Sequence, residues 1–566
     1  MSTAAVVFAA ATAWLAQDPD ADTRAELSAL LAAARADGPG ALAELHDRFE
    51  RRLEFGTAGL RGQIGAGSNR MNRVLVSQAA AGLAEYLLAG HRGSLTNSGE
   101  PTVVIGYDGR INSRVFAIDT AEIMAGAGIG VTLLPRMLPT PVLAFAVRRL
   151  GASAGVMVTA SHNPGSDNGY KVYLGGAHGG SQIVAPADTA IEASILSIAA
   201  ATSVLDLPRS SAYSIAGEEV IDAYVNLTCA LTARPTLAPH FVYTALHGVG
   251  WEIAGRVFEQ AGFGRPDTVE AQIEPDARFP TVPFPNPEET GALDMAIARA
   301  IRVGASLVVA NDPDADRLAI VAPDENGTWQ RLSGNEVGAL LGWRAAERHA
   351  TLTASGVGTF ASSVVSSPAL AEIARHYGLK HTETLTGFKW ISRVPNLVYG
   401  FEEALGYLVD PAKIRDKDGI SAAVDFLGLV ADLTDRGSSL TEHRRDFARL
   451  FGAFASRQIS LRVTSLAQLD ALMTRLRENP PSVIGEVRIR KTTDFATGFA
   501  GFAASDILRY QLEDGSRVIV RPSGTEPKLK VYLDASSTVG TAQERERAAN
   551  AVVSALENAM RSLLGS

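Results

Sequence analysis

The length of the chain argues against a single hydrophobic core, because 566 residues predict roughly three to four domains. Apolar residues make up 46% and charged residues 20% of the sequence, which is typical of a globular protein. The formal net charge of -9 argues against the basic surface that nucleic-acid binding needs, and the single cysteine, Cys229, excludes a disulfide framework and indicates a reducing compartment.

Residues 1–50 predict an N-terminal helical extension. Leu27 and Leu31 share one helix face, and the run Asp37–Gly40, with glycines on both sides of a proline, ends the pattern. The apolar stretch Ala4–Ala11 has no lysine or arginine before it, so it lacks the basic region of a secretory signal. No run reaches the roughly 18 unbroken apolar residues of a membrane span, so we expect a cytoplasmic protein with no membrane contact.

After this extension, short β-branched runs alternate with helical stretches. Such alternation predicts mixed α/β layers, which we expect to form three related domains. The last hundred or so residues combine strands, a hairpin around residues 513–516 and a closing helix from Ala542, so they predict a smaller α+β domain. The predicted strands include Thr102–Ile105, Gly130–Leu134, Val156–Val158, Phe241–Tyr243, Leu307–Val309, Gln458–Val463, Val487–Arg490 and Val518–Val520.

The stretch T-A-S-H-N-P, Thr159–Pro164, follows the predicted strand Val156–Val158 and puts a hydroxyl at a strand end. Ser161 is a candidate nucleophile or phosphoryl carrier, and the imidazole of His162 is near enough to move a proton. A simple turn of serine, asparagine and proline would explain the same residues, so this stretch alone leaves both interpretations open.

Three aspartates, Asp312, Asp314 and Asp316, alternate directly after the predicted strand Ser306–Ala310. Carboxylates with this spacing on a tight loop can converge on one hard cation. A calcium-binding EF-hand loop needs a glycine and a glutamate where this chain has Arg317 and a proline. The open loop therefore favours Mg²⁺, and a solvated acidic turn is the alternative, although the three carboxylates would repel one another without a cation.

The segment R-P-S-G-T-E-P-K-L-K begins at Arg521, directly after a predicted strand. Ser523, Gly524 and Thr525 offer backbone N–H groups and hydroxyls in a tight turn, and the arginine and lysines add positive charge. These groups can bind a phosphate, although a proline- and glycine-containing hairpin with a basic edge would look the same.

The segment G-F-E-E-A-L-G-Y, Gly400–Tyr407, has two adjacent glutamates beside a glycine. Glu402 and Glu403 could hold sugar hydroxyls. Two glutamates are also common at the start of a helix, where they stabilise its N-terminus, so this segment alone is a weak indication.

Together these motifs resemble those of the α-D-phosphohexomutase superfamily over nearly the whole chain, in the order of that family. The helical start, the F-P-N-P-E stretch (Phe284–Glu288) and F-E-E-A-x-G-Y are similar to its longer branch, which holds phosphoglucomutases and phosphopentomutases. The matching segments are F-G-T-A-G-L-R-G (Phe55–Gly62), G-Y-D-G-R (Gly106–Arg110), T-A-S-H-N-P, D-P-D-A-D-R, T-G-F-K-W-I (Thr386–Ile391), the Glu402 loop and R-P-S-G-T-E-P.

The resemblance implies four domains around a central cleft, preceded by the helical extension. Three are related α/β domains and the fourth is the smaller C-terminal domain. The expected boundaries are 1–50 for the extension, 51–205 for domain I with the phosphoserine loop, 206–335 for domain II with the metal loop, 336–455 for domain III with the sugar loop, and 456–566 for domain IV with the phosphate loop.

The resemblance also implies roles for individual residues. Ser161 matches the serine that carries the phosphoryl group, and its phosphate oxygen would complete a Mg²⁺ site. The other matched positions are Asp312, Asp314 and Asp316 as Mg²⁺ ligands; Arg61, His162 and Lys389 around the reacting phosphoryl group, the last two as proton-transfer candidates; Glu402 as a ligand of sugar hydroxyls; Thr386, Gly387, Ala404 and Arg317 as further substrate-binding positions; and Arg521, Ser523, Gly524 and Thr525 as the loop for the non-reacting phosphate.

The implied activity is a phosphosugar mutase that moves a phosphoryl group between C1 and C6 of a hexose phosphate, with a sugar 1,6-bisphosphate as intermediate and activator. Glucose phosphate is the expected substrate, mannose and pentose phosphates are alternatives, and a monomer or homodimer is expected. Many family members have G-E-E-S or G-E-M-S at the sugar loop, whereas Phe401 and Ala404 stand at the glycine and serine positions here. A metal-dependent phosphomonoesterase and a non-catalytic sugar-phosphate binder are the alternatives from other classes.

Overall fold

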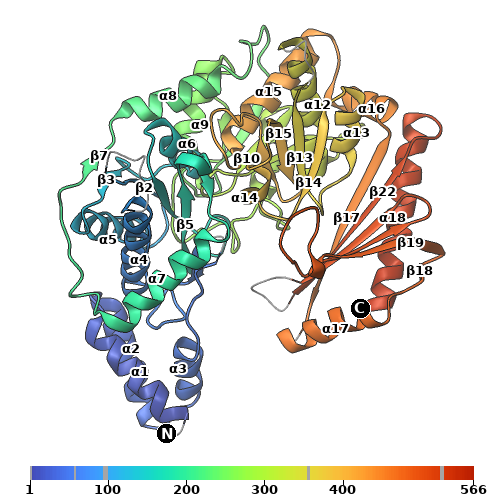
Figure 1. Ribbon diagram of the computed structural model, residues 1–566. Helices are drawn as coiled ribbons and strands as arrows, with labels where there is room; N and C mark the ends of the chain where they lie inside the picture. Colours follow the sequence, from blue (N-terminus) through green and yellow to red (C-terminus); the bar gives the residue numbers. More distant parts are fainter. Residues whose placement is uncertain are drawn as a thin grey trace. The chain divides into compact units, whose positions relative to one another are not determined.

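The computed structural model describes residues 3–56, 59–92, 100–352, 357–463, 465–522 and 528–565 (Figure 1). Contacts divide the chain into two compact units, and each is described by itself. The first unit comprises Met1–Pro323, Trp329–Arg331 and Asp410–Gly428, and the second comprises Asp324–Thr328, Leu332–Val409 and Leu429–Ser566.

The chain begins with the predicted helices, which pack around one apolar core (Figure 1). Trp14, Leu27 and Leu45 are buried in that core. Glu26 connects this bundle to the sheet domain that follows, because its carboxylate pairs with Arg48 at 2.7 Å and accepts a hydrogen bond from the Ala66 N–H at 3.0 Å. The helices are α1 (Thr3–Gln17), α2 (Ala21–Arg35) and α3 (Ala41–Phe49).

The first sheet has parallel strands at its centre. Strand β2 pairs in parallel with β3 and β4, and β5 pairs antiparallel with β4. Helices α4, α5 and α7 bury apolar side chains against Val103 and Ile105 of β2. The elements are β1 (Leu60–Gln63), α4 (Arg73–Arg92), β2 (Thr102–Tyr107), α5 (Ser113–Gly126), β3 (Gly130–Leu133), α6 (Thr140–Arg149), β4 (Ala154–Val158), β5 (Asp167–Leu174), β6 (Ser181–Gln182), α7 (Ala187–Ala201) and β7 (Ser214–Ile215).

The second sheet, also in the first unit, repeats this plan. Strand β8 pairs in parallel with β9 and β10, and β11 pairs antiparallel with β10. The elements are α8 (Glu218–Cys229), β8 (Phe241–Thr244), α9 (Gly250–Ala261), β9 (Asp267–Thr268), α10 (Glu270–Ile273), α11 (Asp294–Val303), β10 (Leu307–Asn311), β11 (Leu318–Pro323) and β12 (Trp329–Arg331).

The third sheet, in the second unit, has the plan again, with β13 parallel to β14 and β15, and β16 antiparallel to β15. The strand orders β3-β2-β4-β5, β9-β8-β10-β11 and β14-β13-β15-β16 are equivalent, which confirms that the three α/β segments are related. The elements are α12 (Gly334–Leu352), β13 (Thr359–Ser363), α13 (Ala369–His376), β14 (Lys380–Thr384), α14 (Phe388–Ile391), β15 (Leu397–Glu402), β16 (Gly406–Leu408) and α16 (Leu440–Leu450), and α15 (Gly419–Asp435) is divided between the first unit and the second.

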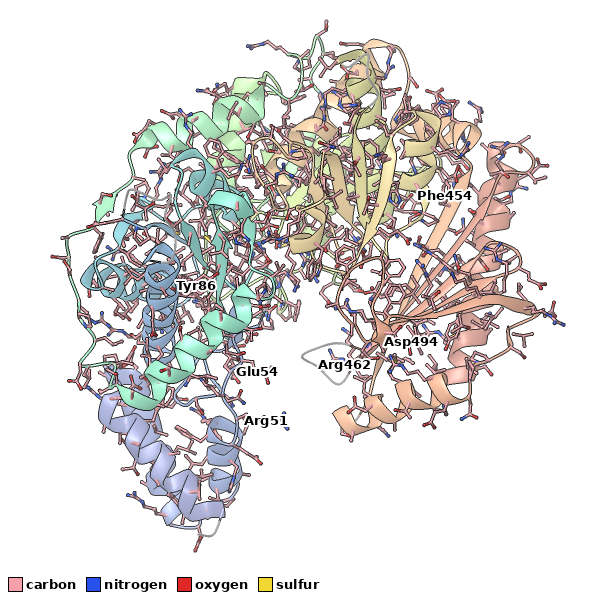
Figure 2. All side chains as sticks on the ribbon, in the orientation of Figure 1. Arg51, Glu54, Tyr86, Phe454, Arg462 and Asp494 are labelled. Carbon is pink, nitrogen blue, oxygen red and sulfur yellow. The ribbon has the colours of Figure 1, made fainter. Side chains whose placement is uncertain are left out.

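The C-terminal domain is a six-stranded antiparallel sheet in the order β17-β22-β21-β20-β19-β18, as the predicted α+β class requires. Helices α17 and α18 pack on one face. Arg462 and Asp494, labelled in Figure 2, end strands β17 and β19. The elements are β17 (Ala453–Arg462), α17 (Leu466–Glu478), β18 (Val483–Ile484), β19 (Val487–Asp494), β20 (Leu508–Leu512), β21 (Arg517–Pro522), β22 (Lys528–Ser537) and α18 (Ala542–Leu564).

Local sequence explains several of these boundaries. The predicted hairpin is formed by β20 and β21, which pair from Gln511 with Arg517. Helix α18 starts at the predicted residue because Thr541 and Glu544 form a capping box in front of it. Strand β14 was missed because its sequence, K-H-T-E-T, is polar, which an edge strand tolerates. Among the described helices, none combines the length and apolar character that a membrane crossing requires.

The ring of Phe401 is buried in the third domain. It stacks on Tyr399 at a ring-centroid distance of 6.4 Å. It also lies against Gly338 of α12, where an added Cβ would be 2.3 Å from the ring. Phe401 therefore requires a glycine at position 338.

We predict that Gly338→Ala destabilises the protein by about 1–3 kcal/mol, because the new methyl group overlaps the Phe401 ring. Gly90→Ala is the matched control, because Gly90 is also helical and has nothing within 4 Å of an added Cβ. It should be neutral or stabilise by up to about 1 kcal/mol through helix propensity. Thermal unfolding of both variants tests this, and equal midpoints would contradict the packing described for Phe401.

Candidate active site

Ser161 lies just beyond the carboxyl end of β4, in a strained backbone conformation. Its φ is 54°, in the left-handed region that residues other than glycine rarely adopt, and the residue is 2% exposed. The N–H of Ser161 donates to Thr159 Oγ1 at 2.8 Å, which helps to hold this turn. Strain of this kind is concentrated at functional sites, where the surrounding structure has to impose it.

A single buried guanidinium imposes the shape of the serine loop. Arg110 donates from Nη2 to the carbonyl oxygens of Ser161 at 2.6 Å and Asn163 at 2.5 Å, and from Nη1 to those of Pro164 at 2.7 Å and Asp167 at 3.0 Å. The G-Y-D-G-R motif indicated a family match but no role for Arg110. Its role is to bind four carbonyl groups that a helix or sheet would otherwise pair.

The three aspartates follow β10 and converge as predicted. Asp312, Asp314 and Asp316 are buried, and one carboxylate oxygen from each lies within 4.8 Å of the others. The Ser161 hydroxyl donates to Asp312 Oδ2 at 2.8 Å, so the serine loop of the first sheet meets the acidic loop of the second. The backbone N–H of Arg317 donates to the other oxygen of Asp312 at 3.0 Å.

Two buried lysines that sequence reasoning missed neutralise part of this charge. Lys171 Nζ lies 2.6 Å from Asp314 Oδ2 and 2.9 Å from Asp316 Oδ2. Lys417 Nζ lies 3.2 Å from Asp316 Oδ2. The sequence does contain one signal for Lys171, because it is a lysine among the apolar residues of β5. A buried ammonium at such a position needs a buried partner. Lys417 follows no comparable pattern, because it reaches the site from residues distant in the sequence.

The residues present fit a divalent cation. Within the described structure, Asp314 Oδ1 and Asp316 Oδ1 are buried and accept no hydrogen bond. A buried carboxylate oxygen without a donor is costly, and a hard cation that prefers oxygen ligands would satisfy both atoms. The three aspartates are therefore able to hold a metal ion such as Mg²⁺.

The surroundings of the three carboxyl groups shift their pKa values in different directions. Burial, followed by repulsion from Asp314 and Asp316, raises the pKa of Asp312 well above its usual value. Burial acts in the same direction on Asp316, but the ammonium groups of Lys171 and Lys417 outweigh it and hold the pKa of Asp316 below its usual value. The Lys171 ammonium does the same for the pKa of Asp314. Two of the carboxylates are thus held ionised beside the serine.

His162 is placed to exchange a proton with Ser161. Its Nδ1 is 3.2 Å from Ser161 Oγ. Burial, together with the positive charges of Arg317 and Arg61, lowers the pKa of His162 well below its usual value, so the ring is neutral at neutral pH and can accept a proton. Arg61, on β1, donates to Asn163 Oδ1 at 3.3 Å and so lies in the same site.

The remaining described residues predicted for the site lie in the second unit. Thr386 and Gly387 precede α14, which carries Lys389, whose Nζ is 5.6 Å from the Trp390 ring centre. Arg521, near the end of β21, is half-buried and pairs across the sheet with Lys530 of β22. Ser523, Gly524 and Thr525 lie outside the described residues.

The two glutamates of the sugar loop do not start a helix, so that alternative was wrong. Glu402 ends β15, and the turn to β16 contains Glu403, Ala404 and Leu405, the last with a φ of 62°. Glu402 and Ala404 are both half-buried, and Glu403 is fixed by hydrogen bonds from Ser363 at 3.1 Å and Ser366 at 2.9 Å. The loop is a hairpin turn with one glutamate anchored inward.

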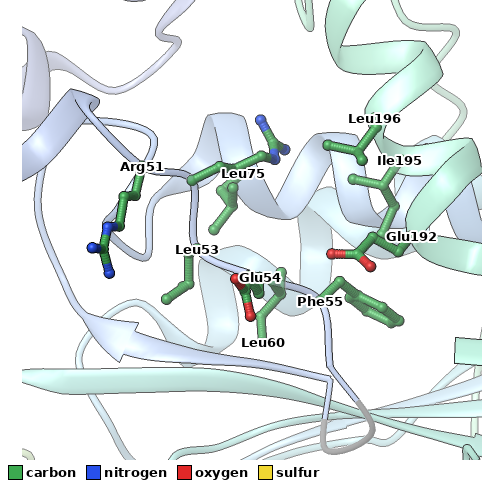
Figure 3. A pocket seen from close by; sticks show the side chains of 10 residues that line it. Arg51, Leu53, Glu54, Phe55, Leu60, Leu75, Glu192, Ile195 and Leu196 are labelled. Atoms are coloured by element: carbon green, nitrogen blue, oxygen red, sulfur yellow. The ribbon is translucent and has the colours of Figure 1, made fainter. Parts of the chain in front are cut away.

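The first unit contains a pocket of about 350 Å³ (Figure 3). Leu60 of β1 lines it, together with Leu75, Ile195, Glu54 and Glu192. Among the residues described as lining it, none is one that the sequence predicted for the site. Alternation along β1 explains this, because successive side chains point to opposite faces of a strand and Arg61 follows Leu60.

Comparison with protein families decides the class of the protein. Four family models match in order, with 52–202 matching phosphoglucomutase/phosphomannomutase alpha/beta/alpha domain I, 220–327 domain II, 333–450 domain III and 462–551 the C-terminal domain. The chain belongs to the phosphoglucomutase/phosphomannomutase family. This phosphomutase is thus a member of the α-D-phosphohexomutase superfamily, an enzyme that transfers a phosphoryl group intramolecularly. The phosphomonoesterase and non-catalytic binder alternatives do not fit this membership.

Individual proteins agree with this class. A Haemophilus influenzae protein named probable phosphomannomutase is 55% identical over 465 residues, which are 82% of this chain and 93% of the other. A Schizosaccharomyces pombe protein named probable phosphoribomutase is 35% identical over 558 residues, 92% of each chain. A crystal structure of a putative phosphomannomutase from Thermus thermophilus has the same fold, with a TM-score of 0.66, 24% identity, and coverage of 91% of this chain and 100% of the other.

We predict that Asp314→Asn weakens Mg²⁺ binding about ten- to a hundredfold, because one anionic ligand is lost and a charged hydrogen-bonding group contributes about 1.5–3 kcal/mol. Titration calorimetry with Mg²⁺ measures this directly. Asp119→Asn is the matched control, because Asp119 is equally buried but pairs with Arg73 at 2.7 Å outside the cluster. Its Mg²⁺ affinity should be unchanged, and an unchanged affinity in Asp314→Asn would contradict the metal assignment.

Proposed function

We propose that this phosphomutase moves a phosphoryl group between C1 and C6 of a hexose phosphate, with Ser161 as the covalent carrier and a sugar 1,6-bisphosphate as intermediate and activator. Glucose 1-phosphate and glucose 6-phosphate are the leading substrate pair. The observation that carries the proposal is the hydrogen bond of 2.8 Å between the Ser161 hydroxyl and Asp312, because it joins a nucleophilic oxygen to a buried site for a divalent cation.

The first half-reaction starts from phosphorylated Ser161. A free hydroxyl of the sugar phosphate attacks phosphorus, the bond to the serine oxygen breaks, and a new bond to the sugar oxygen forms. The proton of the attacking hydroxyl passes to a base, for which His162 and Lys389 are the candidates, and the serine oxygen regains a proton. The product is the 1,6-bisphosphate, so the phosphoryl group is conserved and water does not take part.

The second half-reaction reverses these events at the other end of the sugar. The Ser161 hydroxyl attacks the other phosphoryl group, and His162, with Nδ1 3.2 Å from Ser161 Oγ, accepts its proton. The Arg110 contacts keep the serine loop in place in both directions. Mg²⁺ held by Asp312, Asp314 and Asp316 would stabilise the negative charge on the transferring group.

Arginines complete the arrangement in this proposal. Arg61 and Arg317 raise the positive charge around the reacting phosphoryl group, since both lower the pKa of His162. Arg521, with Ser523, Gly524 and Thr525, binds the phosphate that is not being transferred. That phosphate is alternately at C1 and at C6. A group that recognises the charge of the phosphate is therefore better suited to it than one that recognises the shape of the sugar.

The choice of sugar depends on the hairpin turn of the third domain. Glu402 accepts hydrogen bonds from two sugar hydroxyls in this proposal, with Thr386 and Gly387 as further contacts. Ala404 offers no hydroxyl where many relatives have serine, so discrimination between sugars is weakened. Mannose and pentose phosphates are the alternative substrates of the same mechanism, in line with the relatives named phosphomannomutase and phosphoribomutase.

We predict that Ser161→Ala abolishes conversion of glucose 1-phosphate to glucose 6-phosphate while the protein stays folded, because no phosphoryl carrier remains. A coupled assay with a catalytic amount of glucose 1,6-bisphosphate measures the conversion. Ser166→Ala is the control in the same loop, because Ser166 is exposed and its hydroxyl donates to Asp167 at 3.0 Å. It should keep its activity, and turnover by Ser161→Ala would exclude the serine as carrier.

We predict that Ala404→Ser raises the preference for glucose 1-phosphate over ribose 1-phosphate about fivefold, since one added neutral hydrogen bond contributes about 1 kcal/mol. The measurement is the ratio of kcat/KM for the two substrates in both proteins. An unchanged ratio would mean that position 404 does not contact the sugar and that the preference is set elsewhere.

A further inference from the structure

The second unit contains a buried polar network. It reaches from the hairpin of β15 and β16, called the sugar hairpin below, to β21, the strand that carries Arg521. Its first part surrounds Glu403, next to Glu402. Ser366 donates from Oγ to Glu403 Oε2 at 2.9 Å, and its Oγ accepts a hydrogen bond from the Glu403 N–H at 3.1 Å. Ser363 Oγ lies 2.8 Å from Ser366 Oγ, and both serines are about as buried as a core residue, at 1% exposure.

The second part of the network comes from β21 of the C-terminal sheet. Arg517 donates from Nη2 to the carbonyl oxygen of the same Ser366. Its other nitrogens are bound by carboxylates, Nε by Asp534 at 2.8 Å and Nη1 by Glu383 at 3.1 Å. The guanidinium therefore has one orientation only. It fixes the backbone of Ser366, while the hydroxyl of Ser366 fixes Glu403.

The same strand carries the phosphate-binding residue of the proposed function. Arg521 follows Arg517 by four positions on β21, so both side chains point to the same face of the sheet. That face also packs apolar side chains, among them Ile519 and Tyr532, against Val364 and Val365 in the turn before Ser366. The turn of the third domain that contains Val364, Val365 and Ser366 thus contacts both the sugar hairpin and β21.

We propose that Ser366 and Arg517 are positioning residues for sugar selection: they set the sugar hairpin, through Glu403, relative to the strand of Arg521. The inference rests on the proposed function, since it requires Glu402 to bind the sugar and Arg521 to bind the phosphate. A sugar phosphate bound at both points is discriminated by the separation between them, because a hexose and a pentose place the same hydroxyls at different distances from the phosphate. Neither Ser366 nor Arg517 needs to touch the substrate.

The test is the ratio of kcat/KM for glucose 1-phosphate to that for ribose 1-phosphate. This ratio does not change when part of the enzyme is merely unfolded, because both rates fall together. Ser366→Ala and Arg517→Lys should each change it about threefold or more in the same direction. The double variant should change it no more than the stronger single variant, because both act through one link. The matched control is Arg477→Lys, because Arg477 is half-buried in the same domain and pairs with a carboxylate, Asp494 at 3.0 Å, but has no hydrogen bond to Ser366 or Glu383 among those described.

Arg477→Lys should lower the unfolding temperature and leave the ratio unchanged. Glu402→Gln in the same assay separates the two proposals. If Glu402→Gln changes the ratio and the Ser366 and Arg517 variants do not, the positioning role is overturned and the proposed function stands. If Glu402→Gln leaves the ratio unchanged, the sugar role of the hairpin fails and the positioning role fails with it. Independent, multiplicative effects in the double variant would also overturn the single link.

Discussion

Mutual repulsion of three buried carboxylates is the constraint on which the first unit depends. Unit charges about 4 Å apart repel by about 4 kcal/mol at the effective dielectric of about 20 that applies near protein sites. Asp312, Asp314 and Asp316 lie within 4.8 Å of one another, so the fold has to supply positive charge. Lys171 and Lys417 supply part of it, and the carboxylate oxygens that they leave without a donor are able to bind a cation.

This constraint explains why residues from distant parts of the chain meet at the acidic loop. The aspartates follow a strand of the second sheet, Ser161 follows a strand of the first, and Lys417 belongs to a segment that the chain adds after the third sheet. Carboxyl ends of parallel strands are where α/β folds gather polar groups, since the strand backbone is paired and the turns beyond it are free to vary. In the three equivalent sheets, the turns around Ser161, Asp312 and Glu402 each follow the carboxyl end of a strand.

Sequence alone predicted the fold class, and it predicted the meeting of Ser161, His162, Arg61 and the three aspartates. It could do so because these residues lie in short motifs that resemble those of the α-D-phosphohexomutase superfamily, in the order of that family. It did not predict Lys171, Lys417 or the Arg110 contacts. The contacts of these buried cations join residues that lie 143, 101 and 51 positions apart in the sequence, in the pairs Lys171–Asp314, Lys417–Asp316 and Arg110–Ser161, so no local spacing predicts them.

The direction of the Phe401 ring was beyond sequence analysis for a related reason. It depends on the space that Gly338 leaves on a helix of the same domain, and no local sequence pattern predicts that space. For Glu402 and Glu403 a local pattern exists, but it predicts more than one structure. Their local pattern fits a helix start and a hairpin turn equally well, and the pairing of Glu402 with Gly406 across β15 and β16 decides between them.

The claim that Ser161 carries the phosphoryl group is tested most directly by isolating the covalent enzyme. The protein is mixed with glucose 1,6-bisphosphate labelled in its phosphorus, digested, and mapped by mass spectrometry. We expect one labelled phosphate on the peptide that contains Ser161, and its loss as labelled bisphosphate when glucose 1-phosphate is added. Label on another residue, or label released only as inorganic phosphate, would contradict it.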